Sequence, residues 1–408
     1  MHSHILFRLG LGAAFASLST AHTLFTTLFI NDVNQGDGTC VRMPKDGSTS
    51  TGPIAGLNSP EMACGRDGEN AVAFTCPAPA GAKLTFEFRA WPDARQPGAI
   101  DASHLGSAAI YLKQVSNIST DAAAGPGWFK IYDEGYDASS KKWATEKLIA
   151  DDGLLSVNLP SGLPTGYYLA RTEIISLQNV TATAGVDPQP YVNCAQIFVQ
   201  GQASASPLSI PEDKEVSIPG HVTASHPGLT FNIYHDDPLT TPYQVVGPAV
   251  FFPSSSTPTT RRRQLSRCQR KSSQASTQTQ TQPQTQPTSQ PNTQTQTLKQ
   301  TDGLIPEDCV MKNANWCASP LPAYTDEASC WAASSDCWRQ VDECYSSAPP
   351  SGYRGCSLWE KGMCEKIQAE CGAGLWNGPP SELVDALANE VVDAPVPSGG
   401  KIPAAANA

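Results

Sequence analysis

The stretch Leu84-Thr-Phe-Glu-Phe-Arg-Ala-Trp91 alternates apolar and polar side chains, which is the pattern of a β-strand with one buried face. Similar short runs, rich in β-branched and aromatic residues, occur at 108–115, 167–177 and 191–199. Gly, Pro, Asn and Asp punctuate these runs, and no long stretch of this region has a helical period. Many short strands separated by turn residues predict an all-β domain over residues 22–253, an immunoglobulin- or fibronectin-like β-sandwich.

The net charge of the 408-residue chain indicates which class of partner it does not bind, and its cysteine count indicates in which compartment it works. A net charge of −11 argues against nucleic acid, whose phosphates require clustered Lys and Arg. Thirteen cysteines are typical of a secreted protein with disulfides. Four of them fall in the predicted sandwich and indicate two disulfides, although their spacing does not give the pairing: Cys40, Cys64, Cys76 and Cys194.

The first 21 residues have the features of a signal peptide. Arg8 supplies a positive charge, residues 9–18 form a short apolar core, and Ser19-Thr20-Ala21 fits a cleavage site. The apolar core is too short to span a bilayer, and the C-terminal tail lacks the hydrophobic segment of a lipid anchor. An N-terminal helix of the mature fold is the alternative. We therefore expect a protein free in the extracellular space, without membrane contact, whose first residue after cleavage is His22.

Residues 254–302 are predicted to be a disordered linker, because their Ser, Thr, Gln and Pro side chains bury too little apolar surface to fold. The linker begins with a basic patch at 261–271. This patch is interpreted as a solvated charge run, with a processing site or a contact with anionic cell wall as alternatives. Cys268 lies within it and is the odd cysteine, either free or in an intermolecular bond.

Residues 303–378 are predicted to form a second, small and mainly helical module held by four disulfides, because eight cysteines lie between Cys309 and Cys371. Cys330, Cys337 and Cys344 recur every seven residues and would share one face of a helix. Metal binding by the cysteines is the less favoured alternative, because the module has no CxxC pair. Its five tryptophans either bind sugar or form the core. The tail, residues 379–408, is predicted to be disordered.

Histidines supply the candidate metal ligands. An N-terminal His22 offers two nitrogens, its α-amino group and its imidazole, and a third is available from His104 in Asp101-Ala-Ser-His-Leu-Gly106. Three nitrogens in a tetragonal arrangement suit Cu(II). The alternative for His104 is a solvated or hydrogen-bonded loop histidine.

Several motifs carry a resemblance to a known family. They include His22-Thr-Leu-Phe-Thr-Thr-Leu-Phe-Ile-Asn-Asp-Val-Asn-Gln-Gly36, Ser103-His-Leu-Gly106, Gly166-Tyr-Tyr-Leu-Ala-Arg-Thr-Glu173 and Gln189-Pro-Tyr-Val-Asn-Cys-Ala-Gln-Ile197. In this order, over about residues 22–250, the chain resembles the fungal lytic polysaccharide monooxygenases of auxiliary-activity family nine, formerly glycoside hydrolase family sixty-one.

The resemblance implies roles for individual residues. His22 and His104 would hold one copper, Tyr191 would be its axial tyrosine, and Gln189 would hydrogen-bond toward the oxygen site. Tyr243, in a C-terminal loop, would be an aromatic platform for sugar rings, with a partly buried loop tyrosine as the alternative, whereas Tyr234 is expected in the core. The resemblance further implies a disulfide between Cys76 and Cys194, which leaves Cys40 with Cys64.

One position departs from the family pattern. Gln178 stands where the family usually has a histidine, and an amide donates a hydrogen bond but does not relay a proton near neutral pH. The next residue, Asn179, begins one glycosylation sequon, and Asn117-Ile-Ser119 is another. We therefore expect Gln178 to lower activity or to change its pH dependence.

The function implied by the resemblance is oxidative cleavage of cellulose or a related β-1,4-glucan at carbon 1 or carbon 4. It would use O2 or H2O2 and an external electron donor, either a small molecule or a protein, and we expect a monomer. A hydrolase is disfavoured because no acidic pair is marked in the sequence. The alternatives are a copper- or polysaccharide-binding wall protein with weak or no catalysis, and an adhesion protein that acts through its C-terminal module.

Overall fold

The computed structural model describes residues 22–181, 185–201, 208–253, 298–379 and 402–407. The predicted signal peptide, the basic patch with Cys268 and nearly all of the predicted linker lie outside these residues. Among the described residues, no helix combines the length and the apolar character needed to cross a bilayer.

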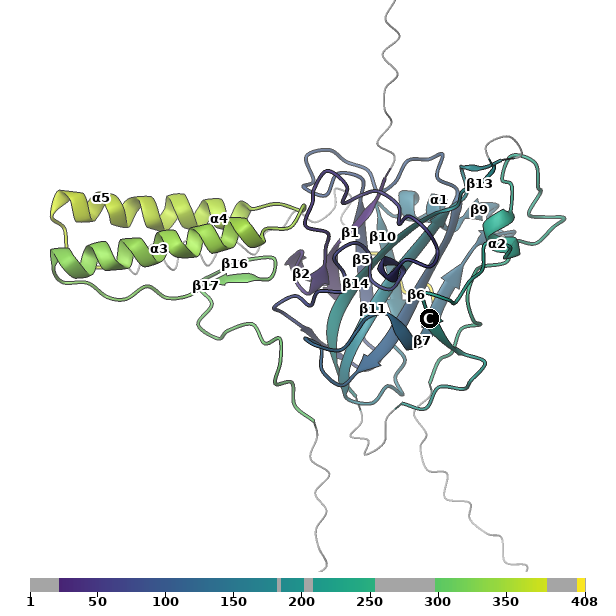
Figure 1. Ribbon diagram of the computed structural model, residues 1–408, viewed down its shortest axis with the longest axis horizontal. Helices are drawn as coiled ribbons and strands as arrows, with labels where there is room; N and C mark the ends of the chain where they lie inside the picture. The colour runs from purple at the N-terminus through teal and green to yellow at the C-terminus, as the bar shows by residue number, and fades with distance from the viewer. Residues whose placement is uncertain (1–21, 182–184, 202–207, 254–297, 380–401, 408) are drawn as a thin grey trace, which may run out of the picture.

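Two β-sheets pack face to face and form the larger unit (Figure 1). The smaller sheet has the strand order β10 (Leu154–Asn158), β5 (Lys83–Arg89), β1 (Leu24–Ile30), β2 (Val33–Asp37). The larger sheet has the order β15 (Glu215–Ile218), β7 (Gly125–Glu134), β6 (Gly106–Val115), β11 (Gly166–Ser176), β14 (Gln189–Gln200), β3 (Val41–Arg42), with β4 (Cys76–Pro79) parallel to β14. The short elements between the strands are η1 (Pro60–Met62), β8 (Tyr136–Asp137), β9 (Lys142–Trp143), α1 (Ala144–Ala150), β12 (Val180–Thr181), β13 (Gly185–Val186) and α2 (Pro227–Thr230).

The four strands predicted from the sequence correspond to β5, β6, β11 and β14, so the β-sandwich prediction is confirmed. Burial of the two central strands, β11 and β14, accounts for the apolar runs seen in their sequences. All eleven residues of β11 are buried, because β11 pairs with β6 on one side and with β14 on the other and both of its faces are covered. The two faces of β14 alternate as a strand requires, with Tyr191, Ala195 and Ile197 in the core between the sheets.

The disulfide pairing expected from the family resemblance is wrong. Cys40 is bonded to Cys76, and Cys64 is bonded to Cys194. The alternation of β14 is the reason, because Cys194 lies on the strand face opposite to Ile197 and packs with Cys64 in the outer apolar cluster. Cys76 sits beside Ile197 and faces the core between the sheets, where Cys40 also lies.

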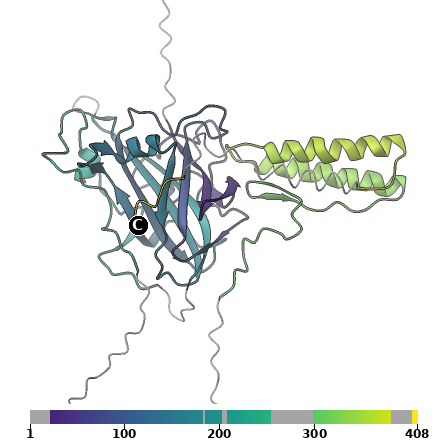
Figure 2. The ribbon, with the colours of Figure 1, turned by 180° about the vertical axis from the view of Figure 1, so that it is seen from behind.

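The C-terminal module is a small helical unit that projects from the side of the sandwich next to β2 (Figures 1 and 2). Its elements are β16 (Met311–Asn313), β17 (Trp316–Ala318), α3 (Glu327–Ser347), α4 (Arg354–Trp359), the π-helical turn η2 (Glu360–Cys364) and α5 (Glu365–Ala373). The three cysteines spaced by seven residues lie buried along α3 and bond to the helices that follow it. All eight cysteines are in disulfides, which excludes a thiolate metal site among them.

The tryptophans of the module fall into two groups. Trp359 is 1% exposed, and Trp316 and Trp338 are partly buried against the same core. Trp331 and Trp376 are exposed at 39% and 36%. Core packing therefore accounts for the first three, as expected for a small domain with few apolar residues.

Direct hydrogen bonds hold the module against β2 and the turn between β2 and β3. The Lys312 ammonium donates to the Gln35 carbonyl at 2.7 Å, and the Asn315 amide donates to the Gly38 carbonyl at 2.7 Å. The Asn315 side-chain oxygen accepts the backbone N–H of Cys40 at 3.0 Å. A carboxamide that accepts and donates to the same turn fixes the turn and the module relative to each other.

The end of the chain differs from the disordered tail that the composition predicts. Residues 402–407 lie along β10, where the Ala406 N–H donates to the Ser156 carbonyl at 2.8 Å (Figure 2). Composition did not reveal this contact because it depends on free backbone groups at the edge of a sheet, and these exist only after folding.

Candidate metal centre

His22 stands two residues before β1, and the intervening Thr23 is held from two sides. The Thr23 N–H donates to the Thr51 carbonyl at 3.1 Å, and the Thr23 hydroxyl donates to the Ala99 carbonyl at 2.7 Å. Because Thr23 is buried and β1 lies inside the smaller sheet, the backbone at His22 has a fixed position at this end of the sandwich.

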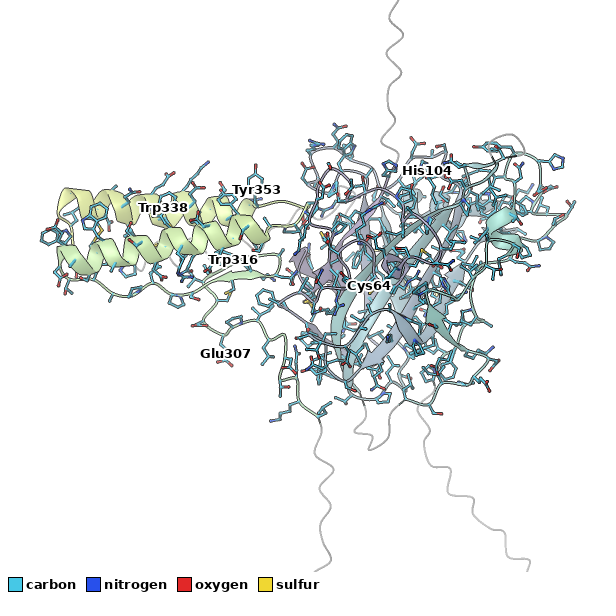
Figure 3. All side chains as sticks on the ribbon, viewed as in Figure 1. Cys64, His104, Glu307, Trp316, Trp338 and Tyr353 are labelled. Atoms are coloured by element: carbon cyan, nitrogen blue, oxygen red, sulfur yellow. A yellow bond between two sulfur atoms is a disulfide. The ribbon has the colours of Figure 1, made fainter. Side chains whose placement is uncertain are left out.

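His104 lies at the same end of the sandwich, in the turn that leads into β6 (Figure 3). Its N–H donates to the Asp101 carbonyl at 3.0 Å, and Ser103 Oγ lies 3.2 Å from its Nδ1. The turn packs closely on β11, since a Cβ added to Gly106 would lie 1.9 Å from the Ile175 carbonyl oxygen. His104 is only 4% exposed and is therefore not a freely solvated loop histidine.

Both imidazoles converge on Tyr191. The ring centroid of Tyr191 lies 6.3 Å from that of His22 and 6.2 Å from that of His104. Tyr191 is 3% exposed and stands near the start of β14, on the face that points between the sheets. Three segments far apart in sequence thus bring two imidazoles and one phenol together.

A chain of side-chain amides continues from the phenol. Tyr191 donates its hydroxyl proton to Gln189 Oε1 at 2.9 Å, and Gln178 Nε2 donates to the same oxygen. Ser176 Oγ in turn donates to Gln178 Oε1. Ser176 and Gln189 are direct partners across β11 and β14, so sheet register places the two glutamines side by side.

The electrostatics of the site favour neutral imidazoles. Burial lowers the pKa of His22, and the nearby Arg66 guanidinium lowers it further. Burial also lowers the pKa of His104 and outweighs the opposing effect of Asp101. Burial raises the pKa of Tyr191 and keeps the phenol protonated. Neutral imidazoles have free lone pairs, which is the state that a metal ligand requires.

The donor set fits copper better than a carboxylate-rich metal site. Within the ranges that the structure describes, no group of three or more His, Cys, Asp or Glu residues is placed to hold a metal ion. Two imidazoles supply two of the three nitrogens expected from the sequence, and the expected third donor is the α-amino group of a mature His22. An all-nitrogen set with a phenol beside it suits Cu(II), as expected from the sequence.

The two tyrosines considered from the sequence differ in burial from what was expected. Tyr243 is packed edge-on against Trp143 and Phe231, with ring centroids 4.9 and 5.5 Å away, and its hydroxyl donates to the Gly228 carbonyl at 2.9 Å. Tyr234, expected in the core, is 65% exposed, and its hydroxyl donates to the Gln178 carbonyl at 3.1 Å. Tyr243 is therefore the partly buried loop tyrosine, and Tyr234 is the aromatic side chain on the surface beside the site.

Sequence reasoning missed Tyr234 although a signal was present. Tyr234 follows Asn232 and precedes His235-Asp236, and such polar residues are typical of a turn. In the structure, Asn232 Oδ1 accepts the Tyr234 N–H at 3.0 Å and Asp236 Oδ2 accepts the Asn232 N–H at 2.9 Å. The turn carries Tyr234 outward, away from the apolar cluster that holds Phe231.

A shallow cavity of about 390 Å³ lies beside Gln189. Residues 53–57 form one wall, residues 186–190 form the other, and Ala224 completes the lining. Val186 is 54% exposed at its edge. The cavity and Tyr234 are both next to the glutamine pair, one through Gln189 and the other through Gln178.

The two glycosylation sequons differ in their surroundings. Asn117 is exposed, in the turn after β6. Asn179 is half-buried, and its Nδ2 donates to Asp187 Oδ2 at 3.4 Å. A glycan on Asn179 would stand next to Gln178, whereas one on Asn117 belongs to a separate turn of the surface.

Two imidazoles that meet a buried tyrosine at one end of a β-sandwich form a candidate mononuclear metal centre. The model of Auxiliary Activity family 9 (formerly GH61) matches residues 22–243. The chain belongs to this family of copper-dependent enzymes that act oxidatively on polysaccharides.

Curated relatives match over most of the chain. AA9 family lytic polysaccharide monooxygenase C of Aspergillus tamarii is 44% identical over 378 residues, which is 92% of this chain and 92% of that protein. AA9 family lytic polysaccharide monooxygenase H of Botryotinia fuckeliana is 44% identical over 377 residues, 92% of this chain and 78% of that protein. These alignments run well past residue 243, so they include the cysteine-rich module.

The fold has a match among solved structures. The structure named CvAA9A is 34% identical, has a TM-score of 0.50, and covers 57% of this chain and 99% of its own. The shared part is the size of the sandwich, and the family resemblance inferred from the motifs is confirmed.

Proposed function

We propose that this chain is a secreted enzyme that holds one copper ion and cleaves cellulose or a related β-1,4-glucan by oxidation at carbon 1 or carbon 4. The observation that carries the proposal is the convergence of His22 and His104 on Tyr191, with ring centroids 6.3 and 6.2 Å apart. Membership of the family supports the chemistry, and the arrangement of the rings supports the choice of these residues.

Copper would be held by the α-amino group and a ring nitrogen of His22, by a ring nitrogen of His104, and beside the phenol of Tyr191. The amino group becomes free only if the chain is cleaved after Ala21, so secretion and metal binding depend on one processing step. When bound, the metal would supply one-electron chemistry with O2 or H2O2, using electrons from an external small-molecule or protein donor.

The residues around the metal site form a hydrogen-bonded chain that fixes the position of the Tyr191 phenol. Burial raises the pKa of Tyr191, so its phenol stays neutral. The phenol hydroxyl donates its hydrogen bond to Gln189 Oε1. Gln178 donates to Gln189 as well, and neither amide exchanges a proton near neutral pH. The protons consumed in the reaction therefore come from solvent rather than from a side chain at position 178.

The surface around the site supplies a place for a sugar chain. The exposed ring of Tyr234 offers an apolar face of the kind that stacks on sugar rings, and its hydroxyl ties it to the carbonyl of Gln178. The cavity is lined by Gln189, the hydrogen-bond partner of Gln178. We infer that a polysaccharide chain crosses Tyr234 and passes over the metal site.

The direct test is mass spectrometry of the products released from cellulose by the mature chain with copper and ascorbate. Oxidised oligosaccharides support the proposal, and the mass and fragmentation pattern separate carbon 1 from carbon 4 oxidation. A matched control keeps one extra residue before His22, which removes the amino ligand and should abolish both tight copper binding and product.

If copper binds with its expected stoichiometry and no oxidised product forms, the chain is instead a copper- or polysaccharide-binding wall protein with little catalysis. Gln178 at the place of the usual histidine is the observation that motivates this second candidate.

Tyr234 and Tyr243 provide a paired test of the docking surface. Tyr234→Ala should weaken cellulose binding by roughly tenfold, as for the loss of one aromatic contact, and leave the melting temperature unchanged because the ring is 65% exposed. Tyr243→Ala should instead lower the unfolding free energy by about 3 kcal/mol, because its packed ring leaves a cavity. If Tyr243→Ala weakens cellulose binding more than Tyr234→Ala does, at a temperature where both variants are folded, our assignment of the platform is wrong.

A further inference from the structure

We infer that the outer edge of β10 is a peptide-binding site and that its occupant is the chain's own C-terminus, residues 402–407. β10 is the last strand of the smaller sheet, so among the described residues one side of its backbone has no neighbouring strand. Free N–H and C=O groups along such an edge readily pair with another extended segment. The end of this chain lies on that edge (Figure 2).

Asn407 makes the most specific contact. Its Oδ1 accepts the backbone N–H of Asn158 at 2.6 Å, and its Nδ2 donates to the carbonyl of Asn158 at 3.1 Å. A carboxamide has one acceptor and one donor side by side, so it pairs with both groups of one strand residue. Alanine at position 407 would make neither bond, and aspartate would lose the donor.

The same side chain also reaches the other sheet. Asn407 Nδ2 lies 3.4 Å from the carbonyl oxygen of Ile131 in β7. A register shift in the β6–β7 ladder lies between the pairs Ile110–Tyr132 and Tyr111–Lys130, and it leaves Ile131 without a partner. Asn407 therefore joins an edge strand of one sheet to an irregular position in the other.

Three further contacts extend the site along the tail. The Ala406 N–H donates to the Ser156 carbonyl at 2.8 Å, which continues the pairing along β10. The Lys83 ammonium, which is paired with Asp32, donates to the Pro403 carbonyl at 3.2 Å. Pro403 and Ala406 also line a cavity of about 350 Å³ against β10 and α1.

The cysteine-rich module lies in the sequence between two segments that contact the sandwich, residues 301–302 and residues 402–407. Before the module, the N–H groups of Thr301 and Asp302 donate to the hydroxyl of Tyr167 at 2.9 and 2.8 Å. After the module, residues 402–407 bind β10. Described residues on both sides of the module, 301–302 and 402–407, therefore contact the sandwich, in addition to the module's own contacts with β2 and the turn after it.

The site is tested by supplying the tail as a separate peptide. A chain that ends at Ser398 should bind a fluorescent peptide of residues 401–408 in a polarisation assay, whereas the full chain should not, because its site is filled. The same peptide with Asn407→Ala should bind at least about tenfold more weakly, since three side-chain hydrogen bonds are lost. Neither readout depends on copper or on activity.

A second variant covers the case in which the shortened chain does not fold. The full chain with Asn407→Ala should accept the added wild-type peptide, while a full chain with Asn292→Ala, a change in the Gln-rich segment, should not. Equal binding by the wild-type chain and the Asn407→Ala chain would overturn the inference, as would equal affinity for the two peptides. A concentration-dependent dimer that the peptide dissociates would also overturn it, because the occupant would then be the tail of a second copy.

Discussion

The Cys64–Cys194 disulfide leads to a quantitative prediction that separates the observed pairing from the one implied by resemblance. The two cysteines are 130 residues apart and both side chains are buried. In the chain-entropy account, closing a loop of about that length removes about 5 kcal/mol of unfolded-state entropy, against about 4 kcal/mol for a loop of the length closed by Cys40 and Cys76. We expect Cys64→Ala with Cys194→Ala to lower the unfolding free energy by nearly 5 kcal/mol, measured by urea unfolding without reductant.

Thiol counting gives the sharper readout. With the observed pairing, the Cys64→Ala, Cys194→Ala chain has the same number of free thiols as the parent chain, because both partners of one bond are removed. With a Cys76–Cys194 bond, the same double variant would expose two new thiols, one from Cys76 and one from Cys40. The matched control is Cys76→Ala with Cys194→Ala, which should gain two thiols. The reasoning is refuted if the first variant gains two thiols and the control gains none.

Three further predictions concern the site and the buried charges. His104→Ala should abolish tight copper binding and oxidised products, and the melting curve should remain cooperative; full activity in this variant would exclude His104 as a ligand. Burial alone would raise the pKa of Glu173, but Arg171 and a neighbouring imidazole hold it below its usual range. A depressed pKa in the folded state stabilises the fold above the unfolded pKa of about 4.3 and loses this effect as pH falls below it. Between pH 6 and pH 3 the melting temperature of the parent chain should therefore fall more than that of Glu173→Gln, and parallel curves would contradict the assignment. Gln178→His should raise peroxide-dependent cleavage or shift its pH optimum between roughly pH 5 and 8, where imidazole titrates. The comparison is made with Asn179→Gln in both backgrounds to remove a glycan, and identical pH profiles would show that position 178 does not control turnover.

Local patterns in the sequence predicted the features that depend on a single strand, helix or short segment. The alternation in Leu84–Trp91 predicted β5 before any neighbour was known, and the apolar residues of β5 do face the core; the polar residues between them are also buried, which the alternation did not predict. The seven-residue spacing of Cys330, Cys337 and Cys344 predicted a single helix face, because helical geometry is set within the chain itself. The candidate ligands were also found this way, since a cleavage signal directly ahead of His22 is a local feature.

Tertiary structure alone decided the features that require two distant segments to meet. The alternation of side chains between the two faces of β14, together with the order of strands in the sheet, placed Cys194 beside Cys64 rather than Cys76. The sequence around the four cysteines does not distinguish them. Packing against Trp143 buried Tyr243, while a turn of polar residues carried Tyr234 to the surface. The composition of the tail predicted disorder, but Asn407 accepts a hydrogen bond from the backbone of Asn158 at the edge of β10. This edge exists only after the sheet has folded. In each case the physical reason is the same: a side chain's partner is chosen by the three-dimensional arrangement of strands, which local sequence patterns do not contain.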